Sequence, residues 1–224
     1  MKSILITFSG IDGAGKSTQI EKLRNYLAEA GIPVKQLAFW DNVVLFRGAR
    51  TGFSRNVLQS DGAVGTPERP AQRNDKNTQT LPLLLGRSLL HLLDVLSLRR
   101  VVKQARAQTN GIIIFDRYIY DQLAALPMHN RLARSYARLL LMIAPTPDLS
   151  YLLDAVPEVA RARKPEYPLD FMHKYRNSYL ELRKMAGLQL IPASDPDDVH
   201  LAVLDRFQNK ICSPQPQMDS AVTA

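Results

Sequence analysis

The feature that most constrains this chain is a glycine-rich segment between an apolar run and an amphipathic stretch. Residues 10–18 read GIDGAGKST and match the phosphate-binding pattern G-x-x-x-x-G-K-[ST]. The apolar run at 4–8 predicts a buried strand before the segment, and the helical spacing of apolar residues over 16–30 predicts a helix after it. This is the setting in which such a loop binds phosphate, although an ordinary glycine turn could join the same elements.

The residue types in the loop explain how it would hold a triphosphate. Glycines let successive backbone N–H groups point inward at phosphate oxygens, and the following helix presents its free N–H groups to the same oxygens. Lys16 offers a mobile cation to the β- and γ-phosphates, and Ser17 offers a hydroxyl to Mg²⁺. We therefore predict ATP and Mg²⁺ as ligands, with the nucleotide bound by Gly10, Asp12, Gly13, Ala14, Gly15, Lys16, Ser17 and Thr18.

A second candidate site residue follows a later strand. Residues 112–115 are all apolar and predict a strand buried on both faces, which leads directly into Asp116. The carboxyl ends of parallel strands meet at one edge of the sheet, where ligands bind. P-loop NTPases place a carboxylate there that organises Mg²⁺, so we predict that Ser17 and Asp116 hold the metal.

The remaining pattern alternates strands and helices, which favours a parallel sheet covered on both faces. Further strands are predicted at 34–40, 149–153 and 188–191, and further helices at 81–108, 131–143, 157–163, 171–185 and 197–210. The expected fold class is α/β, a P-loop NTPase three-layer sandwich with a parallel five-stranded sheet. We expect one domain over 1–212, interrupted by an irregular segment at 41–80, and a disordered tail at 213–224.

Composition narrows the class of protein. There are 29 lysines and arginines against 21 acidic residues, and this excess suits a polyanionic ligand such as a nucleotide or nucleic acid, or simply a solvated basic surface. The absence of RNP, zinc-finger and helix-turn-helix patterns makes nucleic acid an unexpected partner. The single cysteine, Cys212, and an early apolar run too short for a signal peptide indicate a cytoplasmic protein. Charged residues within the leucine-rich stretch 81–98 argue against a membrane span.

Several segments together resemble one family. Residues 8–18 resemble the opening of thymidylate kinases, and Asp116-Arg117-Tyr118 resembles their D-R-Y motif. Residues 154–163 resemble the start of their lid, and 176–182 the helix after it. The resemblance covers most of 1–40 and 110–210. It implies transfer of the γ-phosphoryl group of ATP to a nucleoside monophosphate, dTMP giving dTDP, in a single kinase domain with a short lid at 161–170.

The resemblance also implies roles for individual residues. Arg117 would hold the acceptor phosphate, for which a planar guanidinium is well suited, and Asp12 would lie near the acceptor sugar or the Mg²⁺ shell. Tyr118, Asp121 and Gln122 fall where members of the family line the acceptor pocket, although Tyr118 could equally be a core residue. The acceptor site is thus expected to contain Asp12, Arg117, Tyr118, Asp121 and Gln122.

The lid is expected to supply a catalytic arginine. Members of the family without an arginine in the phosphate loop bring one from the lid, and this loop carries Ala14. We therefore expect Arg163 to neutralise the developing charge and Arg161 to lie close to ATP as well, unless both belong to a solvated basic turn. The predicted catalytic set is Lys16, Asp12, Asp116, Arg117 and Arg163.

The chain departs from the family pattern on the acceptor side. Ser9 stands where an acid is usual, and an R-E-P-G-G-T-like loop is absent, so that Arg47, Arg50 and Arg69 are the candidates to replace its arginine. Where the family carries an arginine facing the base, this chain has Leu96 near Asp94, and an aspartate would prefer an amino group to a thymine carbonyl.

Three functions therefore stay open. The leading one is thymidylate kinase-like activity. The second is a kinase of the same fold acting on another nucleotide, a nucleoside or a phosphorylated metabolite. The third is a non-catalytic regulator that binds nucleotide or nucleic acid. The resemblance also makes a homodimer through the helix at 81–98 plausible, with burial of that helix in the core as the alternative.

Overall fold

The computed structural model describes residues 3–45 and 81–212, together with their side chains except those of 81–87 and 212. Most of the predicted irregular segment 41–80 and the whole tail 213–224 lie outside this description. The same is true of Arg47, Arg50, Arg69 and the side chain of Cys212.

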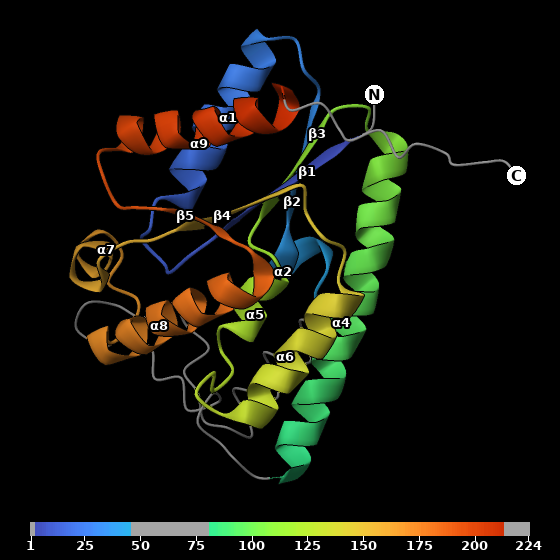
Figure 1. Ribbon diagram of the computed structural model, residues 1–224, viewed down its shortest axis with the longest axis vertical. Coiled ribbons are helices and arrows are strands. Elements are labelled where there is room, and N and C mark those ends of the chain that lie inside the picture. The colour runs from blue at the N-terminus through green and yellow to red at the C-terminus, as the bar shows by residue number, and fades with distance from the viewer. Residues whose placement is uncertain (1–2, 46–80, 213–224) are drawn as a thin grey trace, which may run out of the picture.

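The centre of the molecule is a parallel sheet in the order β2-β3-β1-β4-β5 (Figure 1). Its strands are β1 (Ile4–Ser9), β2 (Val34–Ala38), β3 (Ile112–Asp116), β4 (Leu149–Leu153) and β5 (Gln189–Ile191). Every pairing is parallel, as expected for strands joined through helices. The predicted fold class, a five-stranded parallel α/β sheet with helices on both faces, is confirmed.

Alternation along the strands divides the core into two layers. Leu5, Ile113 and Leu152 point to one face of the sheet, whereas Ile6 and Tyr151 point to the other. Since both faces are covered, β3 and β4 are mostly apolar and buried rather than alternating between apolar and polar residues.

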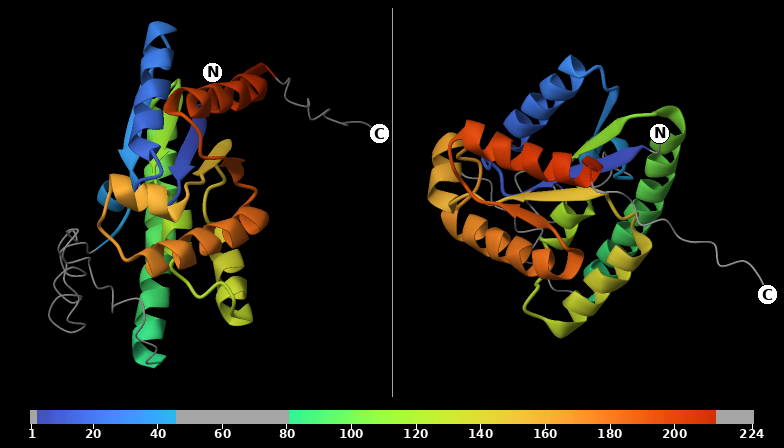
Figure 2. Two further views of the ribbon diagram at one scale, coloured as in Figure 1. Left: turned by 90° about the vertical axis from the view of Figure 1, so that its left-hand side faces the viewer. Right: turned by 45° about the horizontal axis from the view of Figure 1, so that its top comes forward.

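Among the described helices, two pack on the second of these faces and most of the others pack on the first (Figures 1 and 2). The pair consists of α1 (Lys16–Glu29) and α9 (Pro196–Cys212), which also pack against each other. On the opposite face lie α4 (Leu81–Gln108), α5 (Ile119–Leu123), α6 (Arg131–Ile143) and α8 (Leu169–Ala186). Two further short helices, α2 (Phe39–Asn42) and α7 (Pro157–Arg163), follow β2 and β4 in the chain.

The helices α4, α6 and α7 have the bounds that the sequence predicts, but two short elements differ. The strand predicted at 34–40 ends at Ala38, because Phe39 turns into the core as the first residue of α2. Helix α5, which had no periodic signal, begins after Tyr118, whose backbone N–H donates to the Asp121 carboxylate. Among the described residues, no helix is both long and apolar enough to cross a bilayer.

Candidate active site

The phosphate loop leaves β1 after Ser9 and joins α1 at Lys16, at the carboxyl edge of the sheet. Its backbone is shaped by close approaches that exclude side chains. Gly13 has a φ of 84°, and a Cβ atom there would lie 2.2 Å from the carbonyl oxygen of Ala160 in α7. Gly10, with a φ of 144°, would bring its Cβ within 2.5 Å of the Leu153 carbonyl oxygen. The loop is therefore packed directly against the end of β4 and the helix that follows it.

Lys16 lies buried inside this loop. Its Nζ donates to the carbonyl oxygens of Gly10 and Ile11, both at 2.9 Å. Burial, followed by the charge of Arg117, lowers the pKa of Lys16 to about 8, while nearby carboxylates oppose the shift. The ammonium is thus held by two weak acceptors that a phosphate oxygen would replace.

The first turn of α1 leaves its N–H groups available. Gly15 is the N-cap residue, no side chain among the described residues caps the helix, and the first turn contains no acid. Ser17 and Thr18 are exposed in that turn. This arrangement suits an anion, because the free N–H groups and the helix dipole both favour negative charge.

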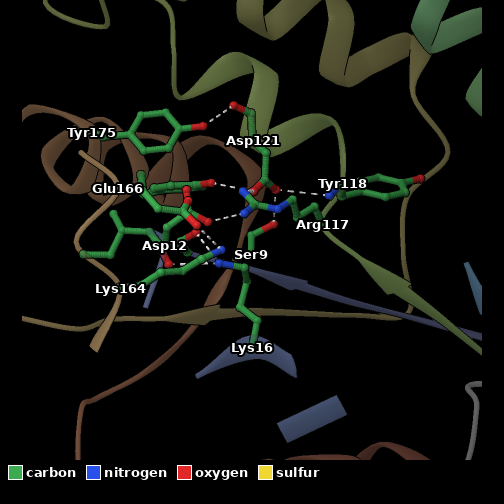
Figure 3. Close-up of polar contacts among 12 residues, drawn as sticks. Ser9, Asp12, Lys16, Arg117, Tyr118, Asp121, Lys164, Glu166 and Tyr175 are labelled. Carbon is green, nitrogen blue, oxygen red and sulfur yellow. Dashed lines mark hydrogen bonds and ion pairs between the residues drawn. The ribbon is translucent and has the colours of Figure 1, made fainter. Parts of the chain in front are cut away.

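Arg117 brings a second cation to the loop from the end of β3. Its backbone is left-handed, with a φ of 67°, and its N–H donates to the Phe8 carbonyl at 2.9 Å. The guanidinium forms an ion pair with Asp12 through Nη2 and lies 3.3 Å from Asp121 through Nη1 (Figure 3). Burial opposes its charge, but Asp121 and Asp12 raise the pKa of Arg117 further above its usual value.

Asp12 and Asp116 share this electrostatic environment. Burial works against the charge of Asp12, yet Arg117, Lys16 and Lys164 together lower its pKa, so Asp12 is a stable anion. Asp116 stands in register with Phe8 of β1, and burial raises its pKa although Lys16 and Arg117 oppose the effect. The structure therefore brings together four of the five predicted catalytic residues.

The structure places two predicted acceptor residues away from any open surface. The ring of Tyr118 is buried against Phe115 and Tyr120, at centroid distances of 5.5 and 5.3 Å, and its hydroxyl donates to the Pro145 carbonyl at 2.7 Å. Figure 3 shows this side chain directed away from Asp12 and Lys16. The core position that the sequence left open for Tyr118 is the one observed. Asp121 is also buried and is surrounded by protein donors.

Gln122 and Asp94 form a buried pair on the acceptor side. Gln122 Nε2 donates to Asp94 Oδ2 at 2.6 Å, and the backbone N–H of Leu45 donates to the other carboxylate oxygen at 3.0 Å. From the sequence, the Asp94 carboxylate was a candidate to bind an amino group of the base. In the structure, both of its oxygens accept hydrogen bonds from protein amides instead. Gln122 Oε1 is buried and has no partner among the described residues.

The predicted lid arginines lie at the end of α7. Arg161 is partly buried and Arg163 is exposed, and neither side chain makes a hydrogen bond or ion pair within 3–45 and 81–212. The next residue, Lys164, pairs with Glu166 at 3.0 Å, and Figure 3 shows both beside Asp12. In this structure the lid thus approaches the loop through Lys164 rather than through Arg163.

Sequence reasoning missed the contribution of α8. Tyr175 and Tyr179 on this helix bind Asp121; Tyr179 lies within the segment 176–182 that resembles the family, but that resemblance assigned neither tyrosine to the site. Their partner lies more than 50 positions away in the sequence, with separations of 54 and 58 residues. No local pattern could have indicated these contacts.

Comparison with known proteins agrees with the fold. No family model matches the chain. The thymidylate kinase of Chlorobium luteolum is 33% identical over 193 residues, which cover 83% of this chain and 78% of that protein. The chain belongs to the thymidylate kinase family. A probable thymidylate kinase of Methanosphaera stadtmanae is 27% identical over 216 residues, covering 92% of this chain and 96% of its own length.

Solved structures of the family share the fold. Thymidylate kinase from Candida albicans superposes with a TM-score of 0.61 at 20% identity, covering 94% of this chain and 93% of that one. The enzyme from Ehrlichia chaffeensis gives a TM-score of 0.57 at 21% identity, covering 93% and 99%. The fold described above is therefore shared with these two kinases.

Proposed function

We propose that this protein transfers the γ-phosphoryl group of ATP to dTMP, giving dTDP and ADP. The observation that carries the proposal is the contact between Asp12 of the phosphate loop and Arg117, the residue that follows β3. It puts the loop that would hold a triphosphate next to a guanidinium suited to a second phosphate. Membership of the thymidylate kinase family supports the same reaction.

The donor side would be the phosphate loop. The backbone of residues 10–18 and the first turn of α1 would bind the phosphates of ATP. Lys16 would leave the carbonyls of Gly10 and Ile11 and bind the β- and γ-phosphates instead, where its charge is favoured. The exchange replaces bonds from the ammonium to two neutral carbonyl oxygens by bonds to negatively charged phosphate oxygens, which attract the ammonium more strongly.

The chemistry of the donor set fits Mg²⁺. Ser17 offers an exposed hydroxyl and Asp116 a partly exposed carboxylate, both oxygen ligands of the kind that Mg²⁺ prefers. We propose these two residues as its protein ligands. When bound, Mg²⁺ would neutralise charge that develops on the phosphate oxygens.

The acceptor side would be organised by Arg117 and Gln122. Arg117 would hold the acceptor phosphate with its planar fork, and Asp12 would keep the guanidinium beside the loop. Asp94 orients the amide of Gln122 so that Oε1 remains an acceptor. An N–H donor such as N3–H of thymine would satisfy this oxygen if acceptor binding moved the side chain into reach, since the oxygen is buried in this structure.

Phosphoryl transfer depends mainly on positioning and on charge neutralisation. Lys16 would neutralise charge on the donor phosphates and Arg117 charge on the acceptor phosphate. We propose that Arg163, with Arg161, adds a further positive charge from the lid at 161–170. The exposed position of Arg163 requires a movement of α7 or of its side chain. The single kinase domain at 1–212 is part of the same proposal.

A homodimer through α4 is the further part of the proposal. Leu89 and Leu96 lie one heptad apart on this helix and are 58% and 44% exposed. Exposed leucines on one helical face suit a symmetric contact between two copies. Sedimentation should give a dimer, and a monomer at high protein concentration would contradict this part. The cytoplasmic location remains a prediction from the sequence.

The test of the reaction is ADP formation measured with each nucleoside monophosphate in turn. We expect rapid ADP formation with Mg·ATP and dTMP, very little without an acceptor, and almost none for Lys16→Ala under the same conditions. ADP formation that is independent of every acceptor, or absent with all of them, would contradict the proposal.

A further inference from the structure

Asp121 is a carboxylate sealed inside the site. It is 1% exposed, and donors from four residues surround its two oxygens. Ser9 Oγ donates to Oδ2 at 2.8 Å and Tyr179 Oη to Oδ1 at 2.7 Å, while the backbone N–H of Tyr118 lies 3.1 Å from Oδ2. The fourth donor is the Arg117 guanidinium, at 3.3 Å from Oδ1. We propose that Asp121 is a positioning residue that sets the direction of Arg117 and links it to α8; this rests on the proposed function.

The two carboxylates on Arg117 have different surroundings, which gives them different tasks. The Asp12 side chain lies on the phosphate loop and is 12% exposed, whereas that of Asp121 has no exposed surface. An incoming phosphate can therefore compete with Asp12 for the guanidinium, but it cannot reach Asp121. The Asp121 contact persists during catalysis, so it is the fixed point from which the guanidinium is aimed.

The backbone of Arg117 makes such a fixed point necessary. A left-handed conformation is disfavoured for a residue with a long side chain, and here it is held by the bond from Arg117 N–H to the Phe8 carbonyl. That bond fixes the main chain but leaves the rotamers of a long side chain free. The contact between Nη1 and Asp121 removes this freedom at the guanidinium itself.

Asp121 is in turn held by α8. Tyr179 binds its carboxylate, and Tyr175 Oη donates to its backbone carbonyl at 2.6 Å. Burial raises the pKa of Tyr179 well above its usual value, so that this hydroxyl stays protonated and donates throughout the physiological range.

The same helix connects these tyrosines with the lid. Tyr167, Phe171, Tyr175 and Tyr179 form a continuous series of ring contacts, with centroid distances of 5.4, 5.4 and 5.0 Å between neighbours. Tyr167 belongs to the lid segment before α8. A shift of the lid would thus be transmitted to Asp121 and from there to the guanidinium.

The inference is tested by separating acceptor from donor kinetics in two variants. We expect Asp121→Asn to raise KM for dTMP about tenfold, the equivalent of one lost charge-assisted hydrogen bond, while KM for ATP changes less than about twofold. Tyr179→Phe keeps the ring and removes only the hydroxyl, so we expect a rise of about threefold in the same constant. The Tyr179→Phe variant also provides the answer if Asp121→Asn does not fold.

The matched control is Asp148→Asn, which makes the same change at a carboxylate that is partly buried and lies outside the site. Asp148 accepts from the backbone N–H of Leu5 and pairs with Arg106, near the amino end of the sheet. We expect this variant to lower Tm without changing either KM. If Asp121→Asn and Tyr179→Phe lower only Tm in the same way, the residue is merely structural and the inference is overturned.

An exchange of the two partners gives a second readout. Ser9 Oγ and Asp121 Oδ2 are 2.8 Å apart. The double variant Ser9→Asp with Asp121→Ser therefore places the carboxylate at position 9 and the hydroxyl at position 121, so that the two hydrogen-bonded groups change places. We expect this double variant to recover part of the dTMP affinity lost in Asp121→Ser; no recovery would contradict a charge-based role. Failure of the proposed function looks different, because the unmodified protein would then produce no dTMP-dependent ADP.

Discussion

Arg117, at the end of β3, is ion-paired with Asp12 in the phosphate loop, although the two residues are 105 positions apart in the sequence. The parallel register of β1 and β3 explains this contact, because it aligns Phe8 with Asp116 at the edge where both strands end. The guanidinium proposed to bind the acceptor phosphate therefore lies beside the loop proposed to bind the phosphates of ATP.

Replacement of Arg117 by lysine should impair acceptor binding specifically. A lysine keeps the charge but loses the planar fork, so we expect kcat/KM for dTMP to fall about tenfold to a hundredfold, the equivalent of roughly 1.4 to 2.8 kcal/mol. The dissociation constant of ATP should stay within about twofold. Arg106→Lys, in the ion pair with Asp148, is the matched control, and it should leave both constants unchanged. Equal losses in dTMP and ATP binding would contradict the assignment of Arg117 to the acceptor.

ATP binding should depend on pH through Lys16. Its pKa of about 8 in the free protein means that the ammonium is partly neutral above this pH, whereas phosphate favours the charged form. ATP binding should therefore take up a proton at pH 8.5 and weaken as the pH rises, by at most about tenfold per pH unit. Calorimetry in two buffers of different ionisation enthalpy measures this uptake.

Two comparisons control the pH experiment. Proton uptake should be close to zero at pH 6.5, where Lys16 is charged before binding, and Lys16→Arg should abolish it at pH 8.5 because a guanidinium stays charged. Between pH 8 and 10.5 the unfolded chain binds more protons at this lysine than the folded one, so its contribution to the free energy of unfolding increases with pH. Absence of proton uptake at pH 8.5 would refute the assigned role of Lys16.

Gly13→Ala should damage the loop more than a strained backbone alone would. The new Cβ would lie 2.2 Å from the Ala160 carbonyl oxygen, so the loop or α7 must move. Gly187→Ala is the matched control, since Gly187 is also left-handed but a Cβ there would meet nothing within 4 Å. We expect the control to cost about 1–2 kcal/mol of unfolding free energy, and Gly13→Ala to cost more and to weaken ATP binding as well. Equal effects of the two variants on ATP binding would be inconsistent with this packing.

Arg163→Ala should lower kcat far more than ATP affinity. The side chain is exposed in this structure and is proposed to act only when the lid closes, so its loss affects the transition state rather than ground-state binding. A fall of about a hundredfold or more in kcat is expected for a charge that stabilises the transferring group. Arg138→Ala, on the exposed face of α6, serves as the control with unchanged kcat. Unchanged turnover in Arg163→Ala would remove this residue from the mechanism.

The sequence predicted the long elements well because their signals are local. Apolar periodicity and flanking residues located α6 and α7 to the residue. Helix α5 was missed because its sequence, IYDQL, is too short to show a helical period and follows a strand directly. Its start depends on the bond from Tyr118 N–H to the Asp121 carboxylate, a capping contact between residues three apart, and a tyrosine at the N-cap position gives no capping signal in the sequence.

The site was predictable where a motif encodes the chemistry and not where contacts cross the fold. Lys16 and Asp116 lie where the motif and the strand pattern placed them. Asp121 was expected in the acceptor pocket, whereas the structure surrounds it with donors from the protein. The missing acid at Ser9 also finds an explanation, because the Asp121 carboxylate accepts from that serine at 2.8 Å and a second carboxylate there would repel it.

The most direct test of the whole account is a crystal structure with a non-hydrolysable ATP analogue, Mg²⁺ and dTMP. The account predicts that Lys16 Nζ leaves the Gly10 and Ile11 carbonyls for the phosphates of the analogue. It also predicts that the Arg117 guanidinium lies about 3 Å from oxygens of the dTMP phosphate while still contacting Asp121. A phosphate loop without the analogue, or an Arg117 side chain turned away from the acceptor phosphate, would contradict it.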